Sequence, residues 1–394
     1  MHGTVTKKGN RWYAVVYEGT DDAGKPKRRW ISAGTRKADA ERVLADLIRK
    51  KHEGEPLALP KGTLGQYLTE RWLPVQESRL RRSTFDAYRR NIDLHVLPAL
   101  GQRQLAKLSP GDLDLLYADL LAKGRRGKGS DNKGLAPKTV RNIHVMMNKA
   151  LSDAQRKGLV VRNVANLADP PKLSAQRRED IKAWDADQLC VFLDAMDSQR
   201  FLPAFHLSAH TGMRRGEILG LRWGDVDLEA GRVSVRQALV SVAYEVHISD
   251  VKTGTGRRTV DIEEDAIAVL ESWRSLRIEE RGGKVPAKTD LVFTRPDGSW
   301  LHPDLFSQIF DRVVAKLDVP EITLHDLRHT HATILLMNGV PVKVVSERLG
   351  HASPAFTMSV YQHVLPGMQA EAAELFAEVL RQAAERKRGG VSGD

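Results

Sequence analysis

The sequence has only one cysteine, Cys190, so no intrachain disulfide can form and nothing points to an oxidising compartment. No run of residues approaches the roughly 18 apolar residues of a membrane-spanning helix. The N-terminal MHGTVTKKGN also lacks the apolar stretch of a secretory signal. The chain contains no Gly-x-x-x-x-Gly-Lys-Ser/Thr phosphate loop and no acidic cluster suited to paired magnesium ions. These absences predict a soluble, cytoplasmic protein with no membrane partner, no nucleotide and no metal.

Basic residues exceed acidic ones, 61 against 50, which gives a formal net charge of +11. This excess favours a polyanionic partner, although ribosome-associated and merely basic proteins have similar compositions. A length of 394 residues suits two or three domains rather than one. No internal repeat is visible.

Residues 1–56 have the pattern of a small domain built from a three-stranded sheet and one helix. Strands are expected at 3–7, 12–17 and 28–32. A helix from 36 to 51, capped by Thr35, has the apolar face Ala40, Val43, Leu44, Leu47 and Ile48. The sheet can then leave its other face to the basic residues Arg11, Lys27, Arg28 and Arg29. That face is either a DNA-binding surface or a solvated basic sheet.

Residues 63–168 have a helical pattern throughout, after a linker that contains two prolines. Capping boxes are expected at Thr63 with Gln66 and at Ser109 with Asp112. The second box opens a helix whose apolar residues are Leu113, Leu116, Leu120 and Leu121, and a further helix runs from 138 to 157. Arg79, Arg81 and Arg82 precede a Ser83-Thr84 cap, where they can contact a phosphate or form a solvated charge run.

Residues 178–386 are expected to form a mixed α+β domain after a second, charged linker. Asp185 with Gln188 caps its first helix. One small antiparallel sheet is expected from 225–235, 236–248 and 257–262, with the Gly254/Gly256 turn between its last strands. A terminal helix has the apolar face Leu375, Phe376, Val379 and Leu380. The fold class is therefore multidomain and mainly α, with small antiparallel β-sheets.

The segment from 323 to 364 begins with a helical pattern that projects His325 and Arg328, three residues apart, from one helix face. His329 and His331 add a superficial likeness to a zinc cluster. No His-Glu-x-x-His motif with its water-activating carboxylate accompanies them. We therefore expect no metal here, and we expect His329 to pack or to form a hydrogen bond.

Two further helices are expected in the rest of this segment. Pro341 suits the first position of a helix that ends at Gly350, with an apolar stripe made by Val344, Val345 and Leu349. His351 follows on a turn. Ser353-Pro354 opens a third helical run that contains Tyr361, whose hydroxyl can attack phosphorus or simply fill a half-buried pocket.

These motifs are informative because of the order in which they occur together. His-x-x-Arg, Leu-Gly-His and a tyrosine ten residues after that histidine resemble the catalytic end of the tyrosine recombinase family, the phage-integrase-type site-specific recombinases. Upstream, TGMRRGE is similar to the family's first-arginine motif, with Arg214 and Glu217 at its functional positions. Lys252, in VKTGTGRRTV, is similar to the lysine on its β-hairpin. The resemblance implies a cofactor-free active site made of Arg214, Lys252, His325, Arg328, His351 and Tyr361, supported by Glu217.

Phosphodiester transfer explains why these residue types occur together. Two arginines pair with the non-bridging phosphate oxygens. Arg215 beside Arg214 leaves open in principle which of them faces the phosphate, and the spacing to Glu217 favours Arg214. His325 can accept the proton of Tyr361, whose pKa the arginines are expected to lower. Lys252 is the candidate acid for the departing 5′-oxygen, and Glu217 is expected to orient an arginine or His325. The product, a 3′-phosphotyrosine, can be resealed without ATP.

The resemblance also implies the wider organisation. Residues 1–56 are similar to an arm-type DNA-binding domain and 63–168 to a core-binding domain, so the protein is expected to act as a homotetramer on double-stranded DNA with core-type and arm-type sites. A directionality factor or a host DNA-bending protein is the implied accessory partner. The main hypothesis is an integrase of a phage or other mobile element. A relaxing type IB topoisomerase and a non-catalytic DNA-binding regulator are the alternatives.

Overall fold

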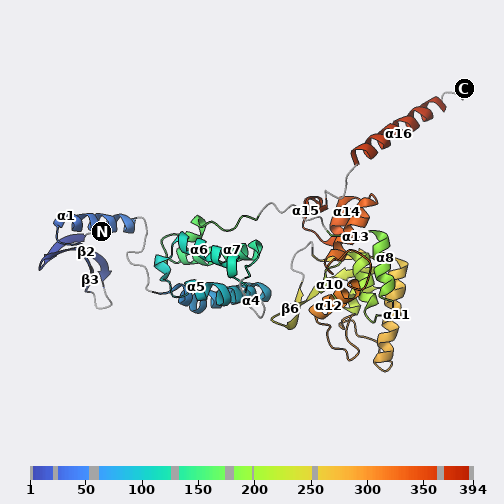
Figure 1. Ribbon diagram of the computed structural model, residues 1–394, viewed down its shortest axis with the longest axis horizontal. Helices are drawn as coiled ribbons and strands as arrows, with labels where there is room; N and C mark the ends of the chain where they lie inside the picture. The colour runs from blue at the N-terminus through green and yellow to red at the C-terminus, as the bar shows by residue number, and fades with distance from the viewer. Residues whose placement is uncertain are drawn as a thin grey trace. The chain divides into compact units, whose positions relative to one another are not determined.

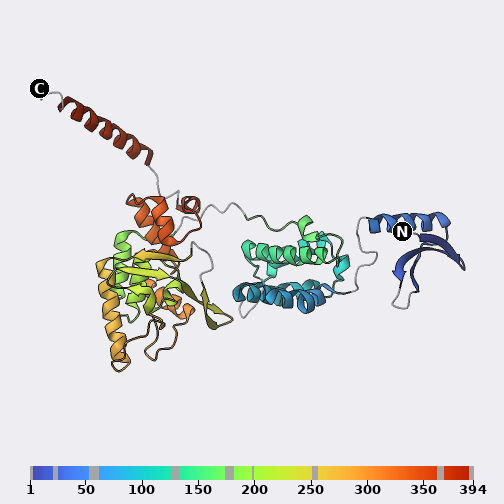
Figure 2. The same cartoon turned by 180° about the vertical axis from the view of Figure 1, so that it is seen from behind.

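The computed structural model describes residues 3–20, 25–52, 62–125, 133–173, 182–197, 199–250, 256–361 and 368–389. The described chain is mainly helical with small antiparallel sheets, as the sequence predicted. It divides into two compact units, 1–174 and 175–394, each of which is described by itself (Figures 1 and 2).

The first 52 residues form a sheet of order β1-β2-β3, whose strands are Gly3–Lys8, Arg11–Thr20 and Pro26–Ser32. Helix α1 (Lys37–His52) covers one face of this sheet (Figure 1). Ala14 and Val16 alternate toward the helix and pack against Leu47, with Ile31 beside them. This small core agrees with the predicted strands and with the predicted apolar face of the helix.

The prediction that four basic residues share the open face of this sheet was wrong for Arg29. Arg29 is the partner of Val16, and directly paired residues of antiparallel strands lie on the same face, so Arg29 is on the helix side. Arg28, the partner of Tyr17, and Arg11 lie on the open face. The side chain of Lys27 lies outside the described residues. Trp30, half-exposed, extends the open face.

A helical bundle follows. Its elements are α2 (Leu64–Gln66), η1 (Tyr67–Trp72), α3 (Leu73–Glu77), α4 (Arg82–Asn91), η2 (Ile92–Val96), α5 (Leu97–Leu100), η3 (Leu105–Lys107), α6 (Pro110–Lys123), α7 (Pro137–Arg156) and η4 (Val164–Leu167). The capping boxes at Thr63 and Ser109 are both present, because each side-chain oxygen accepts from the backbone three residues on. In both views α4 and α5 form one layer, with α6 and α7 in the other (Figures 1 and 2).

Two prolines explain a local departure from α-helical geometry in this bundle. Pro74 and Pro98 lie inside continuous helical segments and have no N–H to donate. Just before each proline the chain forms a π-helical turn, closed by bonds from the N–H of Leu73 to the Leu68 carbonyl and from Leu97 to Ile92. The wider turn lets the helix continue across a residue that cannot make the usual bond.

Two details of the bundle differ from expectation. The Ser83-Thr84 cap was wrong: α4 begins at Arg82, its N-cap residue is Arg81, and no side chain caps it. Both arginines are exposed at this helix start. Leu121 is 37% exposed rather than buried, because it lies off the α6 stripe that Leu113, Leu116 and Leu120 bury.

The second unit contains a longer series of elements. They are α8 (Ala186–Ala195), α9 (Leu202–Thr211), α10 (Arg215–Leu219), η5 (Trp223–Asp225), β4 (Val226–Asp227), β5 (Arg232–Val235), β6 (Gln237–Val242), β7 (Glu245–Asp250), β8 (Arg258–Asp261), α11 (Glu264–Glu280), α12 (Pro303–Val314), α13 (Asp326–Met337), α14 (Val342–Leu349), α15 (Pro354–Tyr361) and α16 (Met368–Gly389). Stacked and tilted rings of Phe192, Phe205, Phe306 and Phe310 fill its main core.

The single sheet expected in this unit was wrong, because its strands form two sheets. β5 pairs with both β4 and β8, whereas β6 and β7 form a separate hairpin. Ala243 and Tyr244 close that hairpin with positive φ angles of 51° and 65°, as a two-residue turn of type I′ requires. The strands before and after residues 251–257 therefore belong to different sheets. The predicted Gly254/Gly256 turn falls mostly on residues 251–255, which lie outside the described part of the chain.

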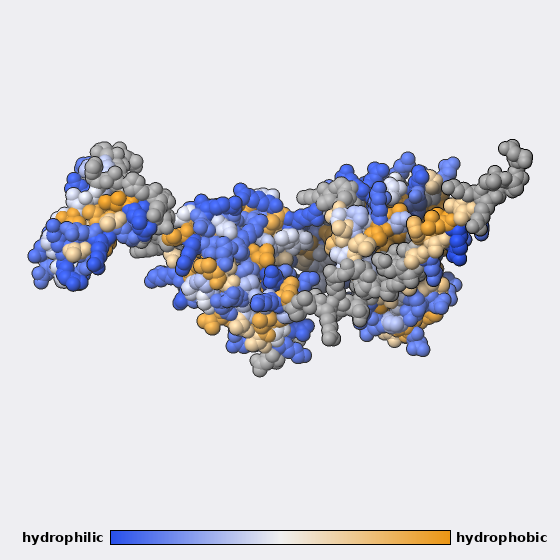
Figure 3. Space-filling model, turned by 90° about the horizontal axis from the view of Figure 1, so that it is seen from above, coloured by the Kyte–Doolittle hydropathy of each residue, from blue (hydrophilic) through white to orange (hydrophobic). Residues whose placement is uncertain are grey.

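The surface of the described residues is mixed in character. On the face drawn in Figure 3, hydrophilic residues predominate and hydrophobic ones form separate patches. The predicted apolar residues of α16 are exposed, from 52% for Val379 to 66% for Leu375 and Phe376. None of the described helices combines the length and the apolar character needed to cross a membrane.

Candidate active site

A glycine at the end of α9 fixes the turn that carries Arg214. Gly212 adopts a left-handed conformation with φ of 62°. A Cβ atom there would lie 2.6 Å from Leu349 Cδ2 and 2.8 Å from His331 Cδ2, so the position has no room for a side chain. The close approach brings the turn before α10 against α13 and α14.

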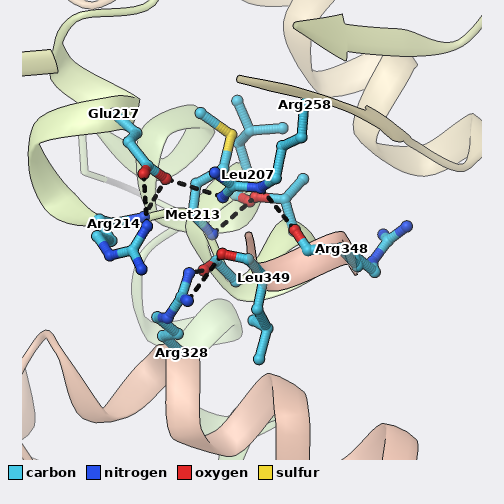
Figure 4. Close-up of polar contacts among 10 residues, drawn as sticks. Leu207, Met213, Arg214, Glu217, Arg258, Arg328, Arg348 and Leu349 are labelled. Carbon is cyan, nitrogen blue, oxygen red and sulfur yellow. Dashed lines mark hydrogen bonds and ion pairs between the residues drawn. The ribbon is translucent and has the colours of Figure 1, made fainter. Parts of the chain in front are cut away.

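Arg214 and Arg258 contact the same carboxylate, that of Glu217 (Figure 4). Glu217 Oε1 accepts from the Arg214 guanidinium at 2.8 Å, and Oε2 accepts from the Arg214 backbone N–H at 2.9 Å. Arg258 donates to Oε2 at 2.8 Å and to the Arg348 carbonyl at 2.7 Å. Glu217 therefore orients two arginines, as expected in part, and it makes no hydrogen bond to His325 among the described contacts.

Charge compensation keeps Glu217 ionised although it is only 4% exposed. Burial by itself would raise the pKa of this carboxyl group. The hydrogen bonds and charges of Arg258 and Arg214 outweigh burial and lower the pKa below its usual value. Arg214 is also 43% exposed in its side chain, so it can both hold Glu217 and reach a ligand.

Arg328 is held by the last carbonyls of two helices. Its guanidinium donates to Gly212 O and to Leu349 O, both at 2.8 Å, at the ends of α9 and α14 (Figure 4). Carbonyls at helix C-termini favour a cation. Burial, with Arg214 and Arg258 nearby, lowers the pKa of Arg328 to about 9, so it remains charged at neutral pH. Gly212 O and Leu349 O are the acceptors of its guanidinium among the described contacts.

The two predicted histidines flank these arginines. His351 follows Gly350, which ends α14 with φ of 68°, and its Nδ1 lies 2.8 Å from Thr357 Oγ1. Burial and the charges of Arg328 and Arg214 lower the pKa of His351 to about 4. His325 is the N-cap residue of α13, and desolvation together with Arg328 lowers its pKa too. Both imidazoles are therefore neutral at pH 7.

Tyr361 ends α15 and is 1% exposed. Its net pKa and its hydrogen-bond partner both differ from expectation. Its pKa is raised to about 12, because burial outweighs the opposing effect of Arg328. Its hydroxyl meets Nδ1 of His329 at 2.7 Å, not His325, which instead stacks edge-on against His329. His329 thus forms the hydrogen bond expected of it, and burial lowers its pKa to about 4.

His331 and Arg348 tie the surrounding elements together. Nδ1 of His331 lies 2.9 Å from the Ala209 carbonyl, which can only accept, and its Nε2 accepts from Arg348 Nε at 3.1 Å. These partners fix a neutral tautomer with the proton on Nδ1. Burial and Arg348 lower the pKa of His331 to about 3. Arg348 also donates to the backbone of His210 and Asp261.

The contacts of the adjacent arginines agree with the preference for Arg214 that its spacing to Glu217 gave. Arg215 donates to the Pro303 carbonyl at 3.1 Å, to Ser307 Oγ at 2.7 Å and to Asp304 at 3.3 Å, so it fastens α10 to α12. Arg214 faces Glu217 instead, and its charge acts on Arg328 and His351.

The structure brings together five of the predicted residues, which are Arg214, Arg328, His325, His351 and Tyr361. Glu217 contacts Arg214 and Arg258. Lys252 lies outside the described residues. Val344, expected in the apolar stripe of α14, is 47% exposed, whereas Val345 and Leu349 are buried. Among the described side chains one group has the spacing of a metal site, and none of its members belongs to this cluster.

Sequence reasoning missed Arg258 and His329 as parts of this cluster. A signal for Arg258 existed. It lies two residues before Val260 on the predicted strand 257–262, so the two share one face of the strand, and Val260 is buried. Alternation would have placed Arg258 on the inner face. His329 lies one helical turn after His325, but only the packing of α15 on α13 shows that it contacts Tyr361.

The chain is similar to known proteins in sequence and in fold. Residues 181–367 match the model described as "Phage integrase family", and residues 63–121 match "Phage integrase, N-terminal SAM-like domain". A "Tyrosine recombinase XerC-like" protein of Caldanaerobacter subterraneus subsp. tengcongensis is 26% identical over 389 residues, covering 93% of this chain and 96% of that protein.

Two solved structures are similar in fold. The Tn1549 transposon integrase in complex with transposon right end DNA has a TM-score of 0.64 and 20% identity, covering 80% of this chain and 99% of that chain. A lambda integrase tetramer bound to a Holliday junction has a TM-score of 0.58 and 16% identity, covering 89% and 92%. At these identities the likeness establishes a shared fold.

Proposed function

Since the chain belongs to the phage integrase family of tyrosine recombinases, we propose that the side chains gathered near Arg328 form an active site that cleaves and rejoins DNA. The protein is a site-specific recombinase of the integrase type. The residues proposed to carry the chemistry are Arg214, Lys252, His325, Arg328, His351 and Tyr361.

In the proposed reaction the Tyr361 oxygen attacks a DNA phosphorus. The bond from phosphorus to the 5′-oxygen breaks, a 3′-phosphotyrosine forms, and the 5′-oxygen leaves as a hydroxyl after taking a proton from Lys252. A second 5′-hydroxyl can reverse the step, because the new ester is close in energy to the bond broken. Arg214 and Arg328 stabilise the charge on the non-bridging oxygens.

The neutral state of the histidines limits which side chains can donate or accept a proton in the reaction. His351 and His325 are uncharged at pH 7, so each can donate one hydrogen bond to phosphate without adding charge. The nearest acceptor for the Tyr361 proton is Nδ1 of His329. Because the phenol has a pKa of about 12 and His329 one of about 4, a free phenolate is not expected before attack. Proton transfer should accompany bond formation.

The rest of the chain is proposed to hold DNA. Residues 178–386 would form the catalytic domain and 63–168 the core-binding domain, in which Arg81 and Arg82, at the exposed start of α4, would contact phosphate. Residues 1–56 would bind arm-type sites through the open face of the sheet, which includes Arg11 and Arg28. A tetramer on two DNA sites is proposed, as is integration and excision of a mobile element.

One observation carries the proposal: Arg214, Arg328 and His351 come from separate elements, yet the charge of Arg214 acts on both Arg328 and His351, and the charge of Arg328 acts on His351 and on Tyr361. Structural cation clusters are normally neutralised. Here Glu217 is the one carboxylate hydrogen-bonded to them among the described contacts. The excess of positive charge is what a phosphate site needs.

A covalent adduct tests the proposal. Attachment-site DNA, recovered from junctions made in cells, is nicked near the cleavage point so that the cleaved strand diffuses away and traps the enzyme. Wild-type protein should form an adduct on denaturing gels, and Tyr361→Phe should form none. Relaxation of plasmids without recombination between paired sites would favour a topoisomerase. Failure of wild-type protein to form an adduct on DNA that it binds would leave a non-catalytic regulator.

A further inference from the structure

Three side chains outside the active site approach one another at the junction of α9 and α11. His206 and His210 are four residues apart on α9, so they share a helix face, and their rings stack with centroids 4.0 Å apart. Glu263, the N-cap residue of α11, has Oε1 2.8 Å from His210 Nδ1. One ligand-grade atom from each of the three lies within 4.8 Å of the others.

One ring nitrogen of His206 lacks a hydrogen-bond partner, and this points to a ligand. Its Nδ1 atom is buried and has no hydrogen-bond partner among the described residues. Buried polar atoms of folded proteins nearly always have a partner. His206 thus brings an imidazole with an unpartnered nitrogen to a cluster of two imidazoles and a carboxylate, and a metal ion is an electron-pair acceptor that such a cluster can bind.

We propose that His206, His210 and Glu263 bind a divalent transition metal ion of the zinc class. Two imidazole nitrogens and one carboxylate oxygen supply three ligands of a tetrahedral site, and because Glu263 is exposed the fourth position is open to water. Two nitrogen ligands select against magnesium and calcium, which take oxygen ligands.

The backbone on both sides of this site is already held in place. Arg348 donates to the His210 carbonyl at 2.8 Å and to the Asp261 carbonyl at 3.0 Å, so one guanidinium bridges the two segments that carry the ligands. The backbone is therefore held in place, and binding an ion requires the two stacked rings to turn so that one nitrogen of each points to it. The ion would add a second link between α9, which leads to Arg214, and β8, which carries Arg258. Its role is therefore structural support of the arginine cluster.

Metal titration of the full-length chain tests the site. The protein is prepared in a Cys190→Ser background, which removes its one thiol, and is freed of metal with a chelator. Calorimetric titration with ZnCl2 should show one tight equivalent, and the thermal unfolding temperature should rise with ZnCl2 but not with MgCl2. Co2+ should give the visible absorption bands of a tetrahedral site.

Variants locate the ion. His210→Asn and Glu263→Gln should each weaken zinc binding by more than about tenfold, since even the loss of an outer-sphere partner commonly costs that much. Glu263→Gln keeps the test decisive if a histidine variant misfolds, because Glu263 is exposed and caps α11 without a side-chain hydrogen bond. His247→Gln is the matched control: that imidazole lies 3.5 Å from the Glu245 carboxylate and is not part of the group with metal-site spacing found among the described residues. The inference is overturned if wild-type protein binds no zinc, or if both variants bind it like the control.

Discussion

The hydroxyl of Tyr361 lies 2.7 Å from Nδ1 of His329, and the tyrosine is 1% exposed. The proposed nucleophile is thus packed among Ala332, Leu336, Val345 and Leu349, and its polar atom is satisfied by one imidazole. This contact connects the end of α15 to α13. It has consequences for stability as well as for chemistry.

Replacing His329 by leucine should destabilise the protein through Tyr361. The buried phenol would lose its partner, which costs about 1–3 kcal/mol of unfolding free energy. Urea denaturation at pH 7 measures this. In a Tyr361→Phe background the same substitution should cost much less, since no hydroxyl is left unsatisfied, and His329→Gln should recover part of the loss. Equal costs in both backgrounds would show that the hydrogen bond does not contribute.

Glu217→Gln should be among the most destabilising single changes in the second unit. Removing one charge from a buried ion pair typically costs about 3–5 kcal/mol, and here two arginines would lose their shared counter-ion. Because the folded pKa of Glu217 lies below its ordinary value of 4.5, its contribution is complete above pH 4.5 and is lost as pH falls through the folded pKa.

Stability curves against pH check the Glu217 prediction. The gap between wild type and Glu217→Gln should be widest at neutral pH and should shrink below about pH 4.5. The exposed carboxylate Glu229 provides a control, and Glu229→Gln should stay within about 0.5 kcal/mol of wild type. A gap that is constant down to pH 3 would contradict the ionised state assigned to Glu217.

Arg258 should act as a positioning residue for cleavage. It is 6% exposed in its side chain and links Glu217 to the Arg348 carbonyl, so its loss should let Arg214 shift. A misplacement near 1 Å can cost about a hundredfold in rate. We expect Arg258→Gln to slow single-turnover cleavage by about that factor while changing DNA affinity far less. Arg232→Gln, in the neighbouring strand and exposed, is the matched control.

The sequence predicted much of this structure because several signals are local. Capping boxes at Thr63, Ser109 and Asp185 placed helix starts, and the left-handed glycine at 350 placed a helix end. Each signal depends on residues within one turn of helix. The helix start at Arg82 was missed because a cap was assigned to Ser83-Thr84, whereas Arg81 is the N-cap residue and no side chain caps the helix.

Longer-range features could not be predicted in this way. Which strands pair is decided by packing, so β8 joins β5 and leaves β6 and β7 as a hairpin. The pKa of Tyr361 is raised, whereas a lowered pKa was predicted. The effect of the nearby arginine charge could be inferred from the sequence, but the larger effect of burial could not. The contact of Tyr361 with His329 likewise depends on how α15 packs, which no spacing reveals.

His331 should be locked in one neutral tautomer. Ala209 O accepts from its Nδ1 and Arg348 donates to its Nε2, so protonation of Nε2 would break the second bond. Its folded pKa of about 3 lies below the ordinary 6.5, so stability is complete above pH 6.5 and falls toward pH 3, by at most about 1.4 kcal/mol per pH unit for this residue. Nitrogen NMR should show the Nδ1-protonated form at pH 7. An imidazole titrating near 6.5 would contradict the assignment.

Lys252→Ala should expose the source of the leaving-group proton. The departing 5′-oxygen is a poor leaving group unless it is protonated, whereas a 5′-sulfur leaves readily as a thiolate. The variant should therefore cleave ordinary site DNA slowly and cleave DNA with a 5′-bridging phosphorothiolate at close to the wild-type rate. Arg328→Lys is the contrasting control, because a lost contact to the non-bridging oxygens cannot be restored by a better leaving group. If Lys252→Ala is impaired equally on both substrates, the lysine contributes charge or position rather than a proton.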